Sequence, residues 1–495
     1  MSEMLDLSDL ALLACTCREW NALIIPYLYD TVQFHNPGRI EGNDPLQLKL
    51  DLFGDPRCTN LKHTQRLLVT GSWYDIYHEI ESNLGSQSML SPAARMLSNI
   101  IASCVIRMPN LKDFNWDLAV SPTQHLVTTV IFTPTLERVQ LRLGTDSTPS
   151  PYFHPPLAFW PPINVRTLTL IQIDDESVLQ SIGAVLRTAT RLRELTMWAD
   201  EDSMLRFSEV SSTWCDQVPF QLTSLDLRGF VDLGRPSCAL WSLLSPVKLR
   251  TLTLNIGPDF DIADLSGFWD DSVVANLRPK QLTTNLVMNG LKDFIKSFSG
   301  LEAFVITSPT IACVAERLDL LLEALGKLHS ATLKVLSIDP RRALAKHLLD
   351  DSLLKQSVNR FTNIEELRFG MVKAVPEHTI QAMLGFPQIR ILYVDLIENS
   401  TEERFIDLER YLLHLLQKGM AKNLKYFMFD DGPLFKVLRK PLRVSKEALP
   451  IGFIHNTFLF GEGVFGGGAV PMPKATQTLP ISVSMNDAYL SITEL

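Results

Sequence analysis

A glycine-rich stretch near the carboxyl end is the pattern in this sequence closest to a phosphate-binding loop. Gly461, Gly463 and Gly466 have the GxGxxG spacing that lets backbone amides approach phosphate oxygens. Such a loop needs a strand before it and a helix after it, so that the helix N-terminus faces the phosphate. Pro471 and Pro473 follow closely and prevent a helix from starting there. We therefore interpret the stretch as a turn, and a nucleotide-binding protein or enzyme is the third of our hypotheses.

The other residue types that perform chemistry are not arranged for it. Cys15 and Cys17 have no further Cys or His at metal-ligand spacing, so we expect them to be small, buried helix residues. The ten histidines are scattered. Adjacent carboxylates such as Asp174 and Asp175 lie in the first turn of an expected helix, and the helix dipole explains them. No Gly-x-Ser-x-Gly elbow or Cys–His pair indicates a nucleophile. The sequence predicts no enzymatic activity, no cofactor and no metal site.

A recurring pattern of aliphatic residues predicts the elements that carry a binding function. Leu222, Leu225 and Leu227 represent it, with one aliphatic residue, another three positions on and a third two after that. Close copies begin at Leu136, Val165, Leu192 and Leu249, and looser ones at Leu61, Leu111, Leu301, Leu333, Ile364, Ile389 and Leu424. From Leu111 onward the copies are 25 to 35 residues apart, except for one step of 52. We interpret that step, and the step of 50 before Leu111, as two units each. A degenerate strand at residues 282–288 would supply the second unit of the 52-residue step.

A period of this size predicts a solenoid. Residues 174–188, 310–328, 343–360, 377–384 and 401–418 carry apolar residues at helical spacing. Each coil is therefore expected to be a strand, a turn and a helix. Parallel strands lie about 4.8 Å apart and packed helices about 8 to 10 Å. The predicted fold is α/β, an irregular leucine-rich-repeat solenoid with a curved parallel sheet on its concave face and helices on its convex face.

Composition limits the classes of function. The 46 Lys and Arg against 55 Asp and Glu give a net charge of −9, which argues against a nucleic-acid partner. The longest apolar runs are too short to span a bilayer and no secretion signal is present, so we expect no membrane partner. Seven irregularly spaced cysteines are typical of reduced thiols. The predicted location is cytoplasmic, nuclear or both.

The N-terminal residues 5–34 predict a short pair of helices. Ser8 is expected to cap the first helix, and Pro26 to interrupt the second. The first would carry Leu10, Leu13 and Cys17 on one side, and the second Trp20, Leu23 and Ile24. On physical grounds the block is either a cap over the core of the first coil or a helical docking unit.

The run from Leu13 to Leu23, with Cys17-Arg18-x-Trp20 as its core, resembles the second half of an F-box. Together with the repeats, the whole chain resembles the F-box and leucine-rich-repeat proteins common in filamentous fungi. The resemblance implies a substrate-recognition subunit of an SCF-type cullin ubiquitin ligase, in which the F-box binds a Skp1-type adaptor and the repeats bind a protein substrate. The positions that match the motif's helix-packing and adaptor-facing residues are Leu10, Leu13, Cys17, Arg18, Trp20 and Leu23.

The sequence departs from this family in two ways. The family's first helix, which opens with leucine-proline, has no counterpart among the nine residues before Leu10. The asparagine that often follows the strand in regular leucine-rich repeats is generally absent. Either an upstream segment is missing, or the N-terminal block serves only as a cap. In the second case the chain is a non-catalytic leucine-rich-repeat scaffold for protein interactions, without a link to ubiquitin.

The expected organisation has three parts: residues 1–35 as a partial F-box-like segment, 36–440 as an array of about 12 to 14 coils, and 441–495 as a C-terminal capping segment and flexible tail. Residues that flank the repeated aliphatics would point into the concave face. The candidate substrate-binding residues there are Arg138, Arg142, Glu194, Trp198, Asp226, Arg228, Arg368, Tyr393 and Asp395. Exposed Trp198 or Tyr393 would be an interface anchor, because aromatic residues and arginine dominate interface hot spots. The threonines of this face are equally explained by strand propensity.

Overall fold

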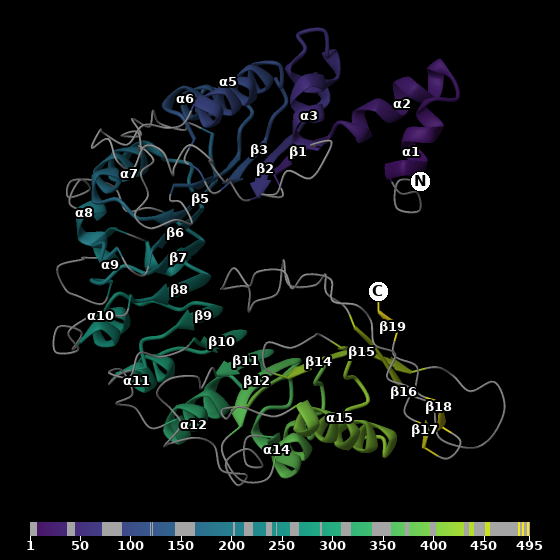
Figure 1. Ribbon diagram of the computed structural model, residues 1–495. Helices are drawn as coiled ribbons and strands as arrows, with labels where there is room; N and C mark the ends of the chain where they lie inside the picture. Colours follow the sequence, from purple (N-terminus) through teal and green to yellow (C-terminus); the bar gives the residue numbers. More distant parts are fainter. Residues whose placement is uncertain are drawn as a thin grey trace, which may run out of the picture. The chain divides into compact units, whose positions relative to one another are not determined.

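The structure is a computed structural model of the chain. It describes residues 7–36, 45–71, 92–118, 120, 122–143, 164–200, 203–211, 221–233, 240–243, 245–257, 267–287, 290–307, 318–338, 358–371, 376–396, 402–429, 435–439, 451–455, 484–485, 488–489 and 493–494. The chain divides into two compact units (Figure 1). Unit 1 contains residues 1–249 and 256–264, and unit 2 contains residues 250–255 and 265–495.

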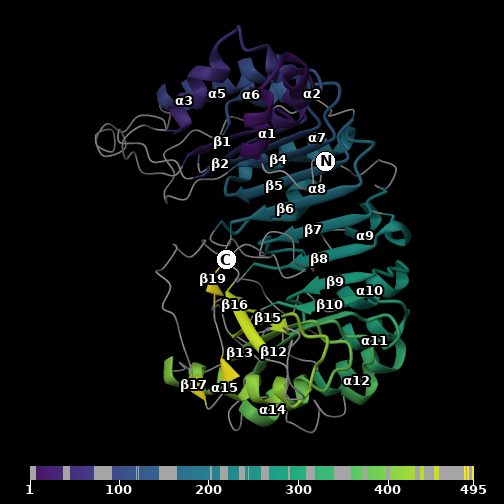
Figure 2. The same cartoon turned by 90° about the vertical axis from the view of Figure 1, so that its right-hand side faces the viewer.

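Unit 1 begins with two helices and continues with strands and helices in alternation. Its elements are α1 (Leu7–Ala14), α2 (Arg18–Leu28), β1 (Thr31–Asn36), α3 (Pro45–Gly54), η1 (Thr59–His63), β2 (Arg66–Gly71), α5 (Pro92–Ile106), β3 (Asp113–Leu118), α6 (Gln124–Ile131), β4 (Arg138–Arg142), β5 (Thr167–Ile173), α7 (Glu176–Thr188), β6 (Glu194–Ala199), α8 (Phe207–Ser211), β7 (Ser224–Arg228), α9 (Leu240–Leu243) and η4 (Pro246–Lys248). Within unit 1, each strand from β1 to β6 pairs in parallel with the next one along the chain, and the last of these pairs is β6 with β7. Figure 2 shows β4 to β7 side by side in chain order.

Unit 2 repeats this arrangement and adds antiparallel strands at its end. Its elements are β8 (Thr251–Asn255), α10 (Phe268–Val274), β9 (Gln281–Thr284), α11 (Leu291–Lys296), β10 (Ala303–Ile306), α12 (Leu318–Leu328), β11 (Val335–Ile338), β12 (Glu366–Met371), α14 (Pro376–Met383), β13 (Ile391–Leu396), α15 (Glu402–Gln417), β14 (Tyr426–Phe429), β15 (Phe435–Arg439), β16 (Ile451–His455), β17 (Ser484–Met485), β18 (Ala488–Tyr489) and β19 (Thr493–Glu494). Strands β8 to β14 are parallel. Strand β15 is antiparallel to β14, and β16 is antiparallel to β15.

The protein is therefore an α/β protein with a solenoid-like parallel sheet, as the repeat spacing predicted. The repeated aliphatics form the core: Leu222, Leu225 and Leu227 are at most 2% exposed. In β3 the buried residues Phe114, Trp116 and Leu118 alternate with half-buried ones. Burying one such side chain contributes about 1.5 to 3 kcal/mol, and no coil can bury its aliphatic residues without its neighbours.

A backbone hydrogen-bond pattern repeats in both units. At most of the described parallel strands, one carbonyl just before the strand accepts from two consecutive N–H groups of the following coil. The Gln65 carbonyl accepts from Lys112 N at 2.8 Å and Asp113 N at 3.0 Å, and the Lys334 carbonyl accepts from Glu365 N and Glu366 N at 2.7 and 3.0 Å. The shared carbonyl sets the register at which each new coil joins the previous one.

Side chains also link neighbouring coils, a few residues before each of these strands. The residue immediately before the first repeated aliphatic donates to a carbonyl of the preceding coil. Asn110 Nδ2 donates to Lys62 O at 2.8 Å, Asn363 Nδ2 to Ala331 O at 2.8 Å, Asn423 Nδ2 to Pro387 O at 3.2 Å and Thr332 Oγ1 to Leu301 O at 2.8 Å. Asparagine is generally absent after the strands, although Asn285 follows β9, but asparagine also precedes several copies of the repeat, and this signal was missed.

Two expectations about spacing have different outcomes. The degenerate strand at residues 282–288 is confirmed as β9, which lies between β8 and β10. The interpretation of the 50-residue step before Leu111 as two units is wrong, because β2 pairs directly with β3 over six residues. One coil spans this step, and the 15-residue helix α5 occupies part of its length.

The helices predicted at residues 174–188, 377–384 and 401–418 are confirmed as α7, α14 and α15. The helix predicted at 310–328 is confirmed over Leu318–Leu328 as α12, and residues 310–317 lie outside the described residues. Most of the helix expected at 343–360 lies outside the described residues, as does the glycine-rich stretch at residues 461–466.

The N-terminal helices differ from the expectation in detail. Helix α1 already includes Ser8. Cys17 is the N-cap of α2, where its Sγ accepts from Trp20 N at 3.5 Å, instead of lying on the first helix. Cys15 is exposed rather than buried. Helix α2 continues through Pro26 to Leu28, so Pro26 does not end the helix.

Candidate functional site

We call the side of the strands that points away from the helices the strand face. In unit 1 this face is polar and several of its charges are paired. Arg138, at the start of β4, places Nε 3.0 Å from Asp113 Oδ2. Arg142, at the end of β4, lies 3.7 Å from Asp117 Oδ1 and also donates to Gln172 Oε1. The positive charges of these two arginines are therefore balanced by carboxylates on β3.

Trp198, Asp226 and Arg228 form one cluster on the strand face of β6 and β7. The Arg228 guanidinium lies 4.5 Å above the centre of the Trp198 ring. Its Nε and Nη2 donate to the two carboxylate oxygens of Asp226 at 2.8 and 2.7 Å. Trp198 Nε1 is buried and finds no hydrogen-bond acceptor within the described part of the chain. The cluster joins an aromatic ring to a fixed guanidinium, the two groups most frequent in interface hot spots.

Glu194 lies apart from that cluster. It is exposed at the start of β6 and accepts from Thr167 Oγ1 at 3.1 Å. Thr169 and Thr196 are half-buried between strands, where their branched side chains suit a pleated surface.

In unit 2 the strand face carries two apolar clusters. Ala303, Val305 and Val335 form one buried cluster. Tyr393 and Met428 form another, with Ile391 and Tyr426 packed against it. The expectation that Tyr393 is an exposed anchor is therefore wrong, because Tyr393 is only 8% exposed.

The signal for this difference was present in the sequence. Strands β10 and β14 read AFVI and YFMF, with no polar residue at alternate positions. Near-continuous apolar runs are typical of strands that are buried on both faces. The burial has an electrostatic effect: it raises the pKa of Tyr393 to about 12, with Glu366 adding to the rise and Arg368 opposing it. Burial, with a contribution from Glu365, also raises the pKa of Glu366.

The remaining two candidates of unit 2 lie on neighbouring strands. Arg368 is half-buried on β12 and lies opposite Tyr393 in the register. Asp395 lies in β13 opposite Gly370.

The N-terminal residues lie on two helices that contact each other. Asn21 Nδ2 donates to Ala14 O at 3.2 Å and joins α2 to the end of α1. Leu10 and Leu13 on α1 are half-buried, whereas Cys17 and Arg18 at the start of α2 are exposed. The structure thus separates the six motif positions into two half-buried residues on α1 and four exposed residues at the N-terminal half of α2.

Helix α2 exposes an apolar stripe, which we call the α2 stripe. Trp20, Leu23 and Tyr27 follow each other at three and four positions, so they lie on one side of the helix. They are 38%, 62% and 62% exposed, and Leu12 on α1 is 68% exposed. Sequence reasoning missed Tyr27 and Leu12, although the spacing of Tyr27 from Leu23 indicates a shared side.

Two further properties of the described residues bear on function. They contain no group of three or more His, Cys, Asp or Glu side chains that could hold a metal ion. Within the same residues, every helix is too short or too polar to cross a membrane.

With the fold and these surfaces in view, we compared the chain with known proteins. No family model matches it, and no curated protein matches it.

Proposed function

We propose that this chain is a non-catalytic substrate-recognition subunit of an SCF-type cullin ubiquitin ligase. In this proposal the leucine-rich-repeat coils hold a protein substrate, and the F-box-like helices α1 and α2 bind a Skp1-type adaptor. The observation that carries it is the α2 stripe, because three large apolar side chains exposed on one side of a short helix are typical of a docking surface. Catalysis belongs to the partner subunits.

The test is co-purification of the full chain with the Skp1-type adaptor of its host. A Trp20→Ala, Leu23→Asp variant is expected to lose the adaptor, because both side chains are exposed and their replacement leaves the core intact. Phe132→Asp is the matched control, since Phe132 is 64% exposed at the end of α6. Capture by the parent and the control but not by the double variant supports the proposal. Absence of capture by the parent, and also by a chain to which an upstream leucine-proline helix has been restored, rejects it.

The second candidate is a protein-interaction scaffold with no link to ubiquitin. The cluster of Trp198, Asp226 and Arg228 favours it, because this cluster needs no adaptor to bind a protein. A photo-crosslinking residue is placed at Thr196, next to the cluster on β6, and in a control chain at Lys327 on α12. The residue at position 196 is expected to capture a protein partner, and the residue at position 327 is not. The scaffold function requires that Trp198→Ala abolish this capture while the chain fails to bind the adaptor.

A further inference from the structure

Arginines at the amino ends of the unit 1 strands fall into two groups. In the first group, each arginine pairs with a carboxylate of the preceding coil. Arg66 Nη2 lies 3.4 Å from Asp30 Oδ2, and Arg138 Nε lies 3.0 Å from Asp113 Oδ2. The fold therefore compensates these two positive charges itself.

The second group lies further along the same edge of the sheet and is held by neutral groups. Arg191 Nη1 donates to Asn164 Oδ1 at 2.8 Å. Arg193 Nη1 donates to the backbone carbonyl of Gln221 at 3.1 Å, and Lys248 Nζ donates to the side-chain Oε1 of the same glutamine at 2.6 Å. Gln221 thus brings two cations close together without neutralising either of them.

Arg166 joins this second group through the backbone. Arg193 N donates to the Arg166 carbonyl at 2.8 Å, so the two arginines occupy the same position in neighbouring coils. All four cations are exposed, and within the described part of the chain none of them forms an ion pair. We call Arg166, Arg191, Arg193 and Lys248 the cation cluster.

The cation cluster is arranged to receive an anion. Side chains of like charge that are held close together repel each other, and an anion that contacts two of them removes this repulsion. A guanidinium donates two parallel hydrogen bonds to a carboxylate or a phosphate, and here neighbouring residues already restrict its position. Two carboxylates lie beside the cluster, Glu137 on the preceding coil and Glu194 next to Arg193. The four cations outnumber them, in a chain whose net charge is −9.

The size of the cluster indicates the class of partner. It extends over consecutive coils, from the coil of β5 to η4, which at about 4.8 Å for each strand spacing is about 14 Å. An extended peptide covers this length with about four residues, at about 3.3 Å per residue. Nucleic acid fits less well, because its continuous row of phosphates would also meet Glu137 and Glu194. A short acidic segment of a protein is therefore the better match.

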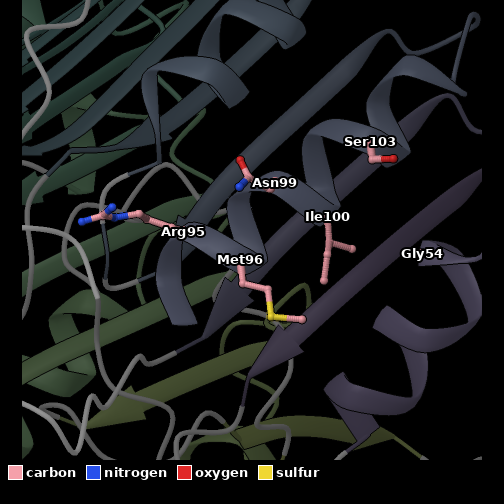
Figure 3. Close-up of a pocket in the computed structure, with 6 residues that line it drawn as sticks. All are labelled: Gly54, Arg95, Met96, Asn99, Ile100 and Ser103. Carbon is pink, nitrogen blue, oxygen red and sulfur yellow. The ribbon is translucent and has the colours of Figure 1, made fainter. Parts of the chain in front are cut away.

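A hollow beside α5 does not offer the same chemistry. Its volume is about 540 Å³, and Figure 3 shows the residues that line it. These residues are Gly54, Arg95, Met96, Asn99, Ile100 and Ser103. Arg95 is the one charged residue among these six, so the hollow does not present neighbouring cations as the cation cluster does.

We propose that the cation cluster binds an acidic peptide segment of a partner protein. Carboxylate or phosphate groups of the segment accept hydrogen bonds from Arg166, Arg191 and Arg193, and Lys248 adds a fourth positive charge. The inference rests on the proposed function in one respect, that the coils hold a protein substrate, and it names the chemical class of that substrate. The cluster shares no residue with the α2 stripe, so adaptor capture and peptide binding are measured separately and can fail separately.

The test is fluorescence anisotropy of dye-labelled peptides with the full chain at about 50 mM salt, where screening is weak. Three peptides of about eight residues, longer than the cluster, are compared. One contains Asp, Glu and Gly, one has phosphoserine in place of the acidic residues, and one has Asn and Gln there. The parent is expected to bind the two anionic peptides and not the neutral one, and the tighter of the two shows which anionic group is preferred. Absence of binding of both anionic peptides up to about 1 mM overturns the proposal.

Two double variants distinguish the cluster from general charge. Arg166→Gln with Arg193→Gln removes two cations of the cluster and is expected to weaken peptide binding about tenfold or more. Arg66→Gln with Arg138→Gln is the matched control, because it removes the same charge from the same edge, but from arginines that already have carboxylate partners. The control is expected to change the affinity less than about threefold. Equal weakening by the two double variants, both folded by circular dichroism, contradicts the proposed site.

A carbodiimide cross-link locates the bound acidic peptide. The reagent joins a carboxylate of the peptide to a lysine amine as an amide, so a lysine beside the bound peptide reacts most efficiently. Lys248 is expected to be cross-linked, and an excess of peptide without the dye to compete, whereas Lys327 on α12 is not expected to react. Equal cross-linking of the two lysines overturns the proposal. So does tighter binding of a single-stranded RNA through the same arginines, since the partner would then be a nucleic acid.

Discussion

His329 is a buried histidine that the fold keeps neutral. Its Nδ1 accepts from Leu301 N at 3.1 Å, and its Nε2 lies 3.0 Å from Ile295 O, so the ring is protonated on Nε2 alone. Burial lowers the pKa of His329, and the hydrogen bond to Ile295 opposes part of that shift. The ring connects the end of α11 to the start of the next coil through two backbone groups.

This histidine predicts a loss of stability in mild acid. The unfolded chain binds a proton near the ordinary pKa of 6.5, whereas the folded chain resists it. Below about pH 6.5 the unfolded state therefore holds more protons. The free energy of unfolding falls as the pH falls, by at most about 1.4 kcal/mol per pH unit for this group. Urea unfolding of the parent and of His329→Gln at pH 7.5, 6.5 and 5.5 measures how the free energy of unfolding of each changes with pH.

The contribution of His329 is the difference between the two pH profiles, because acidic residues contribute to both. The parent is expected to lose more stability than His329→Gln between pH 6.5 and 5.5. Parallel profiles would show that His329 is not the responsible group.

The cluster of Trp198, Asp226 and Arg228 shows what could be predicted of the site. Their residue types and their place on one face followed from the repeat, because strand residues alternate between two faces. The stacking of Arg228 on Trp198 did not follow, since it depends on the register of β6 against β7 and on side-chain rotamers. Tyr393 was placed on the correct face, but its burial depends on neighbouring strands.

Among the elements, the strand ends of unit 1 require glycine. Gly229 follows β7 with φ +80°, and a Cβ there would lie 2.3 Å from Ala199 O at the end of β6. Gly300 has φ +96°, and a Cβ at that position would meet nothing within 4 Å. The two glycines share a left-handed backbone, but only Gly229 also has a close backbone neighbour.

Gly229→Ala is expected to destabilise the protein more than Gly300→Ala. Both variants lose about 1 to 2 kcal/mol by placing a side chain in the left-handed region. Gly229→Ala additionally forces β6 and β7 apart. Thermal unfolding by circular dichroism compares the two variants, and equal melting temperatures would contradict the steric argument.

The side-chain links between coils give a second prediction for the elements. Asn363→Ala removes the hydrogen bond to the Ala331 carbonyl and is expected to cost about 0.5 to 1.5 kcal/mol. Thr362→Ala, at the exposed neighbouring position, is expected to change stability by less than about 0.5 kcal/mol. Urea unfolding of both variants measures the difference, and a Thr362→Ala effect as large as that of Asn363→Ala would refute the role of the link.

Most helices and strands could be predicted, because apolar residues recur with different periods in strands and in helices. Most repeated aliphatics and four helices appeared where spacing put them. The first strand, β1, was missed, because Thr31 to Phe34 lack the repeat pattern and directly follow α2. A local rule that stops a helix at proline predicts an interruption at Pro26, whereas α2 ends at Leu28. The 50-residue step was interpreted wrongly, because a coil contributes one strand to the sheet whatever its length.

At the scale of the whole molecule, a solenoid-like sheet transmits disturbance only to adjacent coils. Phe114 is fully buried on β3, and Phe114→Ala is expected to cost about 3 to 5 kcal/mol locally. Hydrogen exchange followed by mass spectrometry should show faster exchange in β2, β4, α5 and α6, with no change in α14 and α15. Uniformly faster exchange along the chain would mean that the two units unfold as one.

The pairing of each strand with the strand just before it also matters while the protein is being made. A coil that leaves the ribosome finds its partner already synthesised, so folding can follow translation from the N-terminus. Until the next strand emerges, each new strand offers an unpaired edge to other nascent chains. The edge of β2 waits longest, because residues 72–112 separate it from β3, whereas residues 430–434 alone separate β14 from β15. The synthesis of residues 72–112 is therefore the stage of translation at which a pause exposes this protein most to misassembly.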